Sequence, residues 1–407
     1  MPVGLSNTLP KIHPVAGVYL GATAAKIKKN GKTDLVIIEL MEGTKTAATF
    51  TTNAACAAPV TLAKSHLKSK QPRALLINSG NANAATGEAG LENARKTCQW
   101  LADELGCSLE EVLPFSTGVI GEPLPIQKIQ QGLPDALANR SINGWPQAMA
   151  GIMTTDIVPK MVSRVVNIDG HDITFTGMAK GSGMIHPNMA TMLGFVVTDA
   201  KISQALLETC LQQAVKKSFN RITVDGDTST NDACTLSATQ QVDMPSISDI
   251  NSTAYHAFSQ AVNEIMTELA QMIVRDGEGA TKFIEVEVNG GLSEEECLKV
   301  AHAVALSPLV KTAMFASDPN WGRILAAVGR AGLVDLDINQ LQIYLGDVCI
   351  VDKGGRAASY TEDQGQAVMK QADISVRIEL NRGEVSETVW TCDFSYDYVK
   401  INAEYRS

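Results

Sequence analysis

The sequence predicts an α/β fold, a layered α/β sandwich with mixed sheets, and three observations support it. Short apolar runs typical of strands alternate with longer segments whose apolar residues recur at helical spacing. Hairpin signals join some strands and helices separate others, which implies layers of helices and mixed sheets. The 407 residues, 45% hydrophobic and 19% charged, are enough for a large core and for two or three domains.

The individual elements follow from local patterns. Strands at 24–27 and 35–40 flank Asn30-Gly31, a hairpin turn signal. A strand at 73–77 precedes a long helix that Gly106 ends. The remaining predicted elements are strands at 192–197, 283–288, 374–380 and 388–391, helices at 202–215 and 258–273, and a surface connection at 243–252.

Composition excludes several classes of protein. A net charge of −10 and 5% aromatic residues argue against a nucleic-acid-binding surface. The eight cysteines form no CxxC pair and the first twenty residues contain no Arg and no apolar signal core, so we expect buried thiols in the cytoplasm. Isolated histidines predict no metal site, and no apolar stretch is long enough to span a membrane.

Several motifs allow a functional and a structural interpretation. The segment 177–183 is rich in glycine and contains Lys180, so it resembles an anion-binding loop, although such loops are more often flexible turns. Thr117-Gly118 follows a strand predicted to end at Phe115, where a hydroxyl and an N–H can form an oxyanion hole; alone it is a turn. The segment 225–229 lacks the residues of a calcium loop, so we interpret it as a polar turn.

Two further segments each contain a predicted turn with a proline. The segment 318–323 predicts the N-cap of a helix from Ile324 onward, with a structural role as the default. Pro187-Asn188 predicts a turn just before the strand at 192–197. Thr191 therefore lies at the mouth of a buried strand, directly after the small residue Ala190.

Segment 180–193 closely resembles the self-cleavage segment of the ornithine acetyltransferase family, the glutamate N-acetyltransferases of arginine biosynthesis. The resemblance covers essentially the whole chain. The occurrence of all its motifs together is far more specific for the family than any single motif. The other matching segments are 116–121, 154–156, 225–231, 275–280, 318–323 and 401–402.

The resemblance implies a self-cleaving enzyme with an N-terminal threonine nucleophile. The chain would cut itself between Ala190 and Thr191, leaving an alpha fragment of residues 1–190 and a beta fragment of residues 191–407. It also implies a heterotetramer of two alpha and two beta fragments. The amino group freed at Thr191 would then serve as the base for its own hydroxyl.

The resemblance further implies the reaction and the residues that perform it. Thr191 takes the acetyl group from N2-acetylornithine and passes it to glutamate, with Thr117 and Gly118 as the oxyanion hole. Lys180 is expected to bind the substrate carboxylate and Glu278 the distal ammonium of ornithine. The remaining substrate-binding positions are Thr154, Asn402 and Ser407; Ser407 stands where many relatives have Thr.

Two alternatives remain at this point. A self-processing aminopeptidase or amidase would use the same nucleophile but deliver the acyl group to water, and a non-enzymatic protein would use the glycine-rich segment only to bind an anion. No cofactor is expected. Whether acetyl-CoA acts as a second acetyl donor is left open by the sequence.

Overall fold

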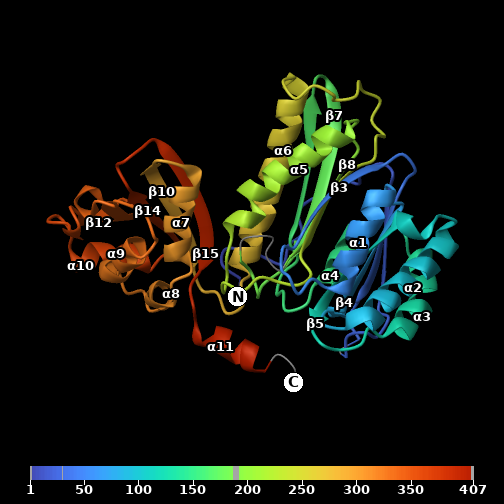
Figure 1. The fold of residues 1–407 in the computed structure, drawn as a ribbon, viewed down its shortest axis with the longest axis horizontal. Helices are drawn as coiled ribbons and strands as arrows, with labels where there is room; N and C mark the ends of the chain where they lie inside the picture. Colours follow the sequence, from blue (N-terminus) through green and yellow to red (C-terminus); the bar gives the residue numbers. More distant parts are fainter. Residues whose placement is uncertain (1, 30, 187–191, 405–407) are drawn as a thin grey trace. The chain divides into compact units, whose positions relative to one another are not determined.

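The computed structural model describes residues 2–29, 31–186 and 192–404 (Figure 1). The chain divides into two compact units, in agreement with the two or three domains predicted from its length. The larger unit contains residues 7–220 and 227–273, and the smaller unit contains residues 1–6, 221–226 and 274–407. The larger unit therefore contains described residues on both sides of the predicted cleavage point.

The larger unit begins with a four-stranded sheet in the order β1-β2-β4-β5, in which only β4 and β5 run parallel. One face packs on α2 and α3 through residues such as Leu35, Leu76 and Cys98. The opposite face carries the alternate residues, among them Val36 and Ile77, as the two-residue period of a strand requires. These elements are β1 (Val18–Thr23), β2 (Leu35–Leu40), β4 (Ala74–Asn81), β5 (Val112–Val119), α1 (Ala58–Ser69), α2 (Gly87–Leu105), α3 (Ile126–Ala138) and α4 (Trp145–Ile152).

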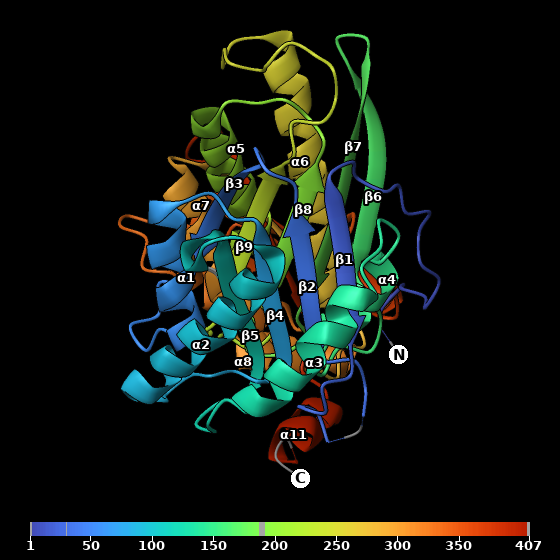
Figure 2. The same ribbon diagram turned by 90° about the vertical axis from the view of Figure 1, so that its right-hand side faces the viewer.

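A second, five-stranded sheet in the order β3-β9-β8-β7-β6 packs against that opposite face. The Phe115 and Phe195 rings, one from each sheet, meet edge to face with centroids 5.2 Å apart. Helix α6 covers the outer face, where Phe258 contacts Phe175, so the larger unit is layered as helix, sheet, sheet, helix (Figure 2). These elements are β3 (Lys45–Phe50), β6 (Met161–Ile168), β7 (His171–Lys180), β8 (Leu193–Thr198), β9 (Ala233–Ala238), α5 (Gln204–Lys217) and α6 (Thr253–Arg275).

The smaller unit contains a six-stranded mixed sheet in the order β13-β12-β11-β14-β10-β15. Strands β10 and β14 are parallel, and the other pairs are antiparallel. Its core joins α7 and α9 to the sheet through side chains such as Val300, Val328 and Val376. These elements are β10 (Phe283–Gly291), β11 (Gln342–Leu345), β12 (Val348–Asp352), β13 (Gly355–Arg356), β14 (Asp373–Glu379), β15 (Val385–Cys392), α7 (Glu294–Ala305), α8 (Pro308–Phe315), α9 (Trp321–Gly329), α10 (Glu362–Met369) and α11 (Tyr396–Ala403).

Most predicted elements are confirmed within a few residues, including α2, which ends at Gly106 in the left-handed conformation. The strand predicted at 24–27 is wrong. The partner of β2 is β1, and the residues after β1 form a loop in which the Asp34 carboxylate accepts the N–H groups of Ala25 (2.7 Å) and Lys28 (2.8 Å). A side chain thus satisfies backbone groups that a strand would have paired.

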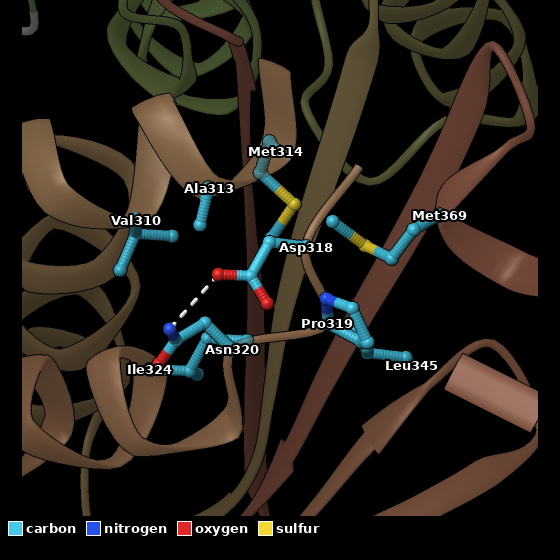
Figure 3. A pocket seen from close by; sticks show the side chains of 9 residues that line it. All are labelled: Val310, Ala313, Met314, Asp318, Pro319, Asn320, Ile324, Leu345 and Met369. Atoms are coloured by element: carbon cyan, nitrogen blue, oxygen red, sulfur yellow. Dashed lines mark hydrogen bonds between the residues drawn. The ribbon is translucent and has the colours of Figure 1, made fainter. Parts of the chain in front are cut away.

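The segment 318–323 forms the predicted turn and cap, although the helix begins at Trp321 rather than Ile324. The Asn320 side-chain oxygen accepts the Arg323 N–H at 3.1 Å. Its amide nitrogen donates to Asp318 Oδ2 at 3.0 Å (Figure 3). Apolar side chains surround the turn, among them Met314 and Met369. This segment therefore packs and caps α9, as its structural interpretation predicts.

Two general expectations can also be compared with the structure. All eight cysteines are free thiols, and five of them are buried. Within the described residues no single helix is both long and apolar enough to cross a membrane; α7 and α8, which meet at a bend of 56°, pass that test only as a pair.

Candidate active site

The predicted oxyanion residues lie in β5, which continues to Val119 instead of ending at Phe115. Thr117 is buried, and Gly118 pairs in register with Gly80 of the parallel strand β4. Gly118 has φ +133°, and a Cβ at this position would lie 2.4 Å from the Gly80 carbonyl carbon. Only glycine fits here, because both the backbone angle and the approach of β4 exclude a side chain.

Lys180 meets Thr117 from the other sheet of the larger unit. It is the last residue of β7, so the segment from Gly177 to Lys180 is strand and not the loop that the sequence predicted; the turn begins at Gly181. The Lys180 ammonium is buried and donates a hydrogen bond to Thr117 Oγ1 at 3.1 Å. The predicted carboxylate-binding cation and the predicted oxyanion hydroxyl thus lie in direct contact.

Asp156 holds this site together. Its carboxylate accepts the N–H of Thr154 at 2.9 Å, the N–H of Gly181 at 2.8 Å and the Lys160 ammonium at 2.6 Å. Burial alone would raise the pKa of Asp156, but Lys160 and Lys180 hold that pKa below its usual range. The arrangement connects the predicted substrate residue Thr154 to the turn that follows Lys180.

The Asp156–Lys160 pair predicts a large loss of stability when one partner is removed. Asp156→Asn should lower the free energy of unfolding by about 3–5 kcal/mol, because it leaves the Lys160 charge buried without its partner. The stability that this ion pair contributes should be complete above the ordinary aspartate pKa of about 4, and it should be lost as the pH falls below that value. Denaturant unfolding at several pH values measures this.

Glu92→Gln is the matched control for that experiment. Glu92 and Lys96 have the same four-residue spacing on α2, but about half of each side chain is exposed. Such a pair is worth about 0–0.5 kcal/mol, so the control should change stability very little. Equal losses in the two variants would contradict the role given to Asp156.

Ala190 and Thr191, the predicted cleavage residues, lie outside the described residues, but both flanking strands are described. Lys180 of β7 pairs with Leu193 of β8 across this segment. Met192 is buried, and its N–H donates to Asp232 Oδ1 at 3.0 Å. The segment that contains Thr191 therefore connects two neighbouring strands of one sheet, β7, which carries Lys180, and β8.

The predicted polar turn before β9 also reaches the oxyanion strand. Ser229 Oγ accepts the Asn231 N–H at 3.0 Å, the local hydrogen bond expected of such a turn. The Asn231 amide donates to the carbonyl oxygens of Ala82 at 2.7 Å and of Ser116 at 2.9 Å. This turn therefore supports the backbone that leads into Thr117.

The smaller unit brings together two other predicted substrate residues, Glu278 and Asn402. Asn402 Nδ2 donates to Glu278 Oε2 at 2.9 Å, and Glu278 is buried. Arg275, three residues before Glu278, forms its ion pair with Asp373, at 2.6 Å. Ser407 lies outside the described residues.

Lys28 is a residue that the sequence did not indicate. Its side chain lies over Gly80, the partner of Gly118, and its ammonium donates to the Thr33 carbonyl at 2.8 Å. Burial lowers the pKa of Lys28 to about 8, against the raising effects of Asp34 and Asp156. No local signal reveals this, because Lys28 stands in a run of lysines typical of an exposed loop.

Comparisons with known proteins identify the family of this chain. The ArgJ family matches residues 19–407. The arginine biosynthesis bifunctional protein ArgJ of Pseudomonas syringae pv. tomato is 56% identical over 407 residues, the whole of both chains. The crystal structure of the Bacillus halodurans protein of that name is 38% identical, with a TM-score of 0.50, and covers 52% of this chain and 99% of its own.

A third relative is the ornithine acetyltransferase of Mycobacterium tuberculosis, whose crystal structure is a complex with ornithine. It is 32% identical and covers 42% of this chain and 92% of its own, with a TM-score of 0.38. The full-length matches support acetyl transfer over the aminopeptidase or amidase alternative and over a non-enzymatic role. The chain belongs to the ArgJ family and is an acetyltransferase of arginine biosynthesis.

Proposed function

We propose that the enzyme transfers the acetyl group of N2-acetylornithine to glutamate through an acetyl ester on Thr191, giving ornithine and N-acetylglutamate. The contact of the buried Lys180 ammonium with the Thr117 hydroxyl carries this proposal. It puts a cation for a carboxylate and a donor for an oxyanion at one place, beside Gly118. Acyl transfer to an amino acid needs both.

The nucleophile is prepared by cleavage of the chain. The Thr191 hydroxyl attacks the Ala190 carbonyl carbon, and the resulting ester is hydrolysed to leave fragments 1–190 and 191–407. The freed α-amine has an ordinary pKa of about 7.7–8.0, so a substantial neutral fraction is present near neutral pH. This neutral amine then removes the proton from its own hydroxyl.

Each half-reaction passes through a tetrahedral intermediate. Thr191 Oγ bonds to the acetyl carbon of acetylornithine, and ornithine leaves with the proton that the amine has taken. The glutamate amine then attacks the same carbon, the bond from that carbon to Thr191 Oγ breaks, and the Thr191 amine passes the proton lost by the glutamate nitrogen to Oγ. The Thr117 hydroxyl and the Gly118 N–H stabilise the oxyanion in both steps.

The substrate contacts follow from charge. Lys180 binds the α-carboxylate that both substrates carry, and Glu278, held by Asn402, accepts the distal ammonium of ornithine. Thr154 and Ser407 complete the substrate contacts. We further propose a heterotetramer of two alpha and two beta fragments that acts in the cytoplasm without a cofactor, and the eight free thiols support that compartment.

The test of this function is the order of the two half-reactions. Acetylornithine without glutamate should leave one acetyl group on the 191–407 fragment, detected by intact mass, and double-reciprocal plots should be parallel. Intersecting lines with no acetylated fragment would count against the proposal. Acetyl-CoA supplied as the only donor, with glutamate, decides whether the enzyme also accepts that donor.

The proposed contact of Glu278 with the ornithine ammonium predicts how the enzyme selects its acetyl donor. Glu278→Gln should weaken acetylornithine use by about 30-fold or more, equivalent to at least about 2 kcal/mol, because the buried glutamate no longer pairs with the ornithine ammonium. Transfer from acetyl-enzyme to glutamate should change far less, since glutamate has no distal ammonium. Single-turnover measurement of each half-reaction separates the two effects.

Glu384→Gln is the control, because Glu384 is an exposed glutamate of the same unit. It should alter neither half-reaction. Equal losses in both half-reactions for Glu278→Gln would contradict the ammonium role and leave Glu278 as structural support for Asn402.

A further inference from the structure

The two substrates of the proposed reaction differ at their distal ends, and the charged contacts proposed above suit only one of them. Acetylornithine ends in an ammonium, for which Glu278 is the proposed partner. Glutamate ends in a second carboxylate, which the Glu278 carboxylate would repel. An acceptor with two carboxylates therefore calls for a cation besides Lys180, which the proposed function assigns to the α-carboxylate.

Lys28 is a cation whose backbone is fixed by a buried carboxylate. Asp34 has no exposed surface, and its side chain accepts the Lys28 N–H at 2.8 Å and the Ala25 N–H at 2.7 Å. The Asp34 backbone oxygen accepts the N–H of Ser79, a residue of β4, at 2.9 Å. Asp34 thus ties the backbone of Lys28 to the strand that carries Gly80.

The side chain of Lys28 lies at the candidate site. A Cβ on Gly80 would come within 3.0 Å of Lys28 Cγ, so the stem of the lysine packs directly on this glycine. Gly80 is the register partner of Gly118, whose N–H is the proposed oxyanion donor. The Lys28 ammonium donates to the Thr33 carbonyl at 2.8 Å. An ammonium has three N–H donors, so it can keep this bond and still bind a carboxylate.

The charges around Lys28 favour an anionic ligand. Burial lowers the pKa of Lys28 to about 8, and the positive charge of Lys180 adds to that lowering, so the two ammonium groups repel each other. The carboxylates that favour the charged lysine, Asp34 and Asp156, already accept backbone N–H groups. A substrate carboxylate beside Lys28 would therefore stabilise its ammonium form.

We propose that Lys28 binds the side-chain carboxylate of the acceptor glutamate while Lys180 binds its α-carboxylate, an inference that rests on the proposed function. The donor has no second carboxylate, so Lys28 takes no part in forming the acetyl-enzyme. Glu278 and Lys28 then select opposite substrates, because the first attracts the ornithine ammonium and the second attracts the glutamate side chain. The enzyme can in this way accept two amino acids whose distal groups have opposite charges.

The experiment measures the two half-reactions separately in Lys28→Met, which keeps an apolar stem over Gly80 but removes the charge. KM for glutamate should rise by at least about 10-fold, because a charge-assisted contact is lost. The preference for glutamate over the neutral glutamine as acceptor should fall by a similar factor. The rate at which acetylornithine acetylates the enzyme should stay that of the wild type.

Lys29→Met is the matched control, because Lys29 is the next residue and its side chain is exposed. It should change neither half-reaction. A rise in KM for glutamate as large as that of Lys28→Met would overturn the proposal, since the effect would then follow the net charge of the loop.

Lys28→Gln separates charge from structural support, since its amide can still donate to the Thr33 carbonyl. We expect the same selective loss of glutamate use, with a melting temperature close to that of the wild type. If Lys28→Met is insoluble, a selective loss in folded Lys28→Gln supports the proposal, and unchanged glutamate use in that variant overturns it.

The outcomes distinguish this inference from the function beneath it. A wild type that transfers no acetyl group from acetylornithine to glutamate would overturn the proposed function and this inference together. A wild type that does so, with an unchanged KM for glutamate in Lys28→Met, would overturn the role of Lys28 alone. Equal losses in both half-reactions would also overturn that role, because Lys28 would then serve a group that both substrates share.

Discussion

Thr191→Ala is expected to leave the chain uncut and to lower acetyl transfer by at least about 10⁴-fold. The change removes the hydroxyl that attacks Ala190 in cleavage and the acetyl carbon in catalysis. Removing the nucleophile of an acyl-transfer enzyme typically leaves only the catalysis that binding and the oxyanion hole supply. N-terminal sequencing and intact mass measure cleavage, and turnover of acetylornithine measures activity.

Thr191→Ser is the control, because serine keeps a hydroxyl at the same position. It should still be cut and should retain activity well above that of Thr191→Ala. A new N-terminus in the wild type at any residue other than Thr191 would overturn the assignment. Normal activity of the uncut alanine variant would do the same.

Thr117→Val is expected to reduce kcat by about 100- to 1,000-fold with little change in KM. Valine has the shape of threonine but lacks the hydroxyl, so the oxyanion loses a donor and the Lys180 ammonium loses the acceptor at 3.1 Å. The oxyanion exists only in the transition state and the intermediate, which is why the effect belongs in kcat. Steady-state kinetics with both substrates measures it.

Thr176→Val is the matched control for that variant. Thr176 is a buried threonine of β7, like Thr117 in type but with other partners. Its hydroxyl donates to the His13 carbonyl at 2.7 Å and shares a hydrogen bond with the Ser163 hydroxyl at 2.8 Å. Its loss should cost about 1–2 kcal/mol of stability and leave kcat unchanged. If Thr117→Val raised only KM, Thr117 would bind substrate and would not stabilise an oxyanion.

Local sequence patterns predicted the elements whose stabilising contacts are close in the chain. Helix α2 was predicted because its buried residues recur every three or four positions and Gly106 supplies the left-handed cap. The cap at Asn320 is local for the same reason, since its partner Arg323 is three residues away. The strand wrongly predicted at 24–27 shows the limit, because Asp34 binds the backbone of that loop and prevents it from pairing as a strand.

The sequence by itself determined the layered α/β class and, through its joint motifs, the family and the identity of the candidate residues. Only the tertiary structure decided which of those residues meet. Lys180 and Thr117 are 63 positions apart and come from different sheets, and Glu278 and Asn402 are 124 positions apart. Such contacts depend on strand order and sheet packing, which spacing along the chain does not encode. The lowered pKa of Lys28 arises from burial, a property of the packed fold alone.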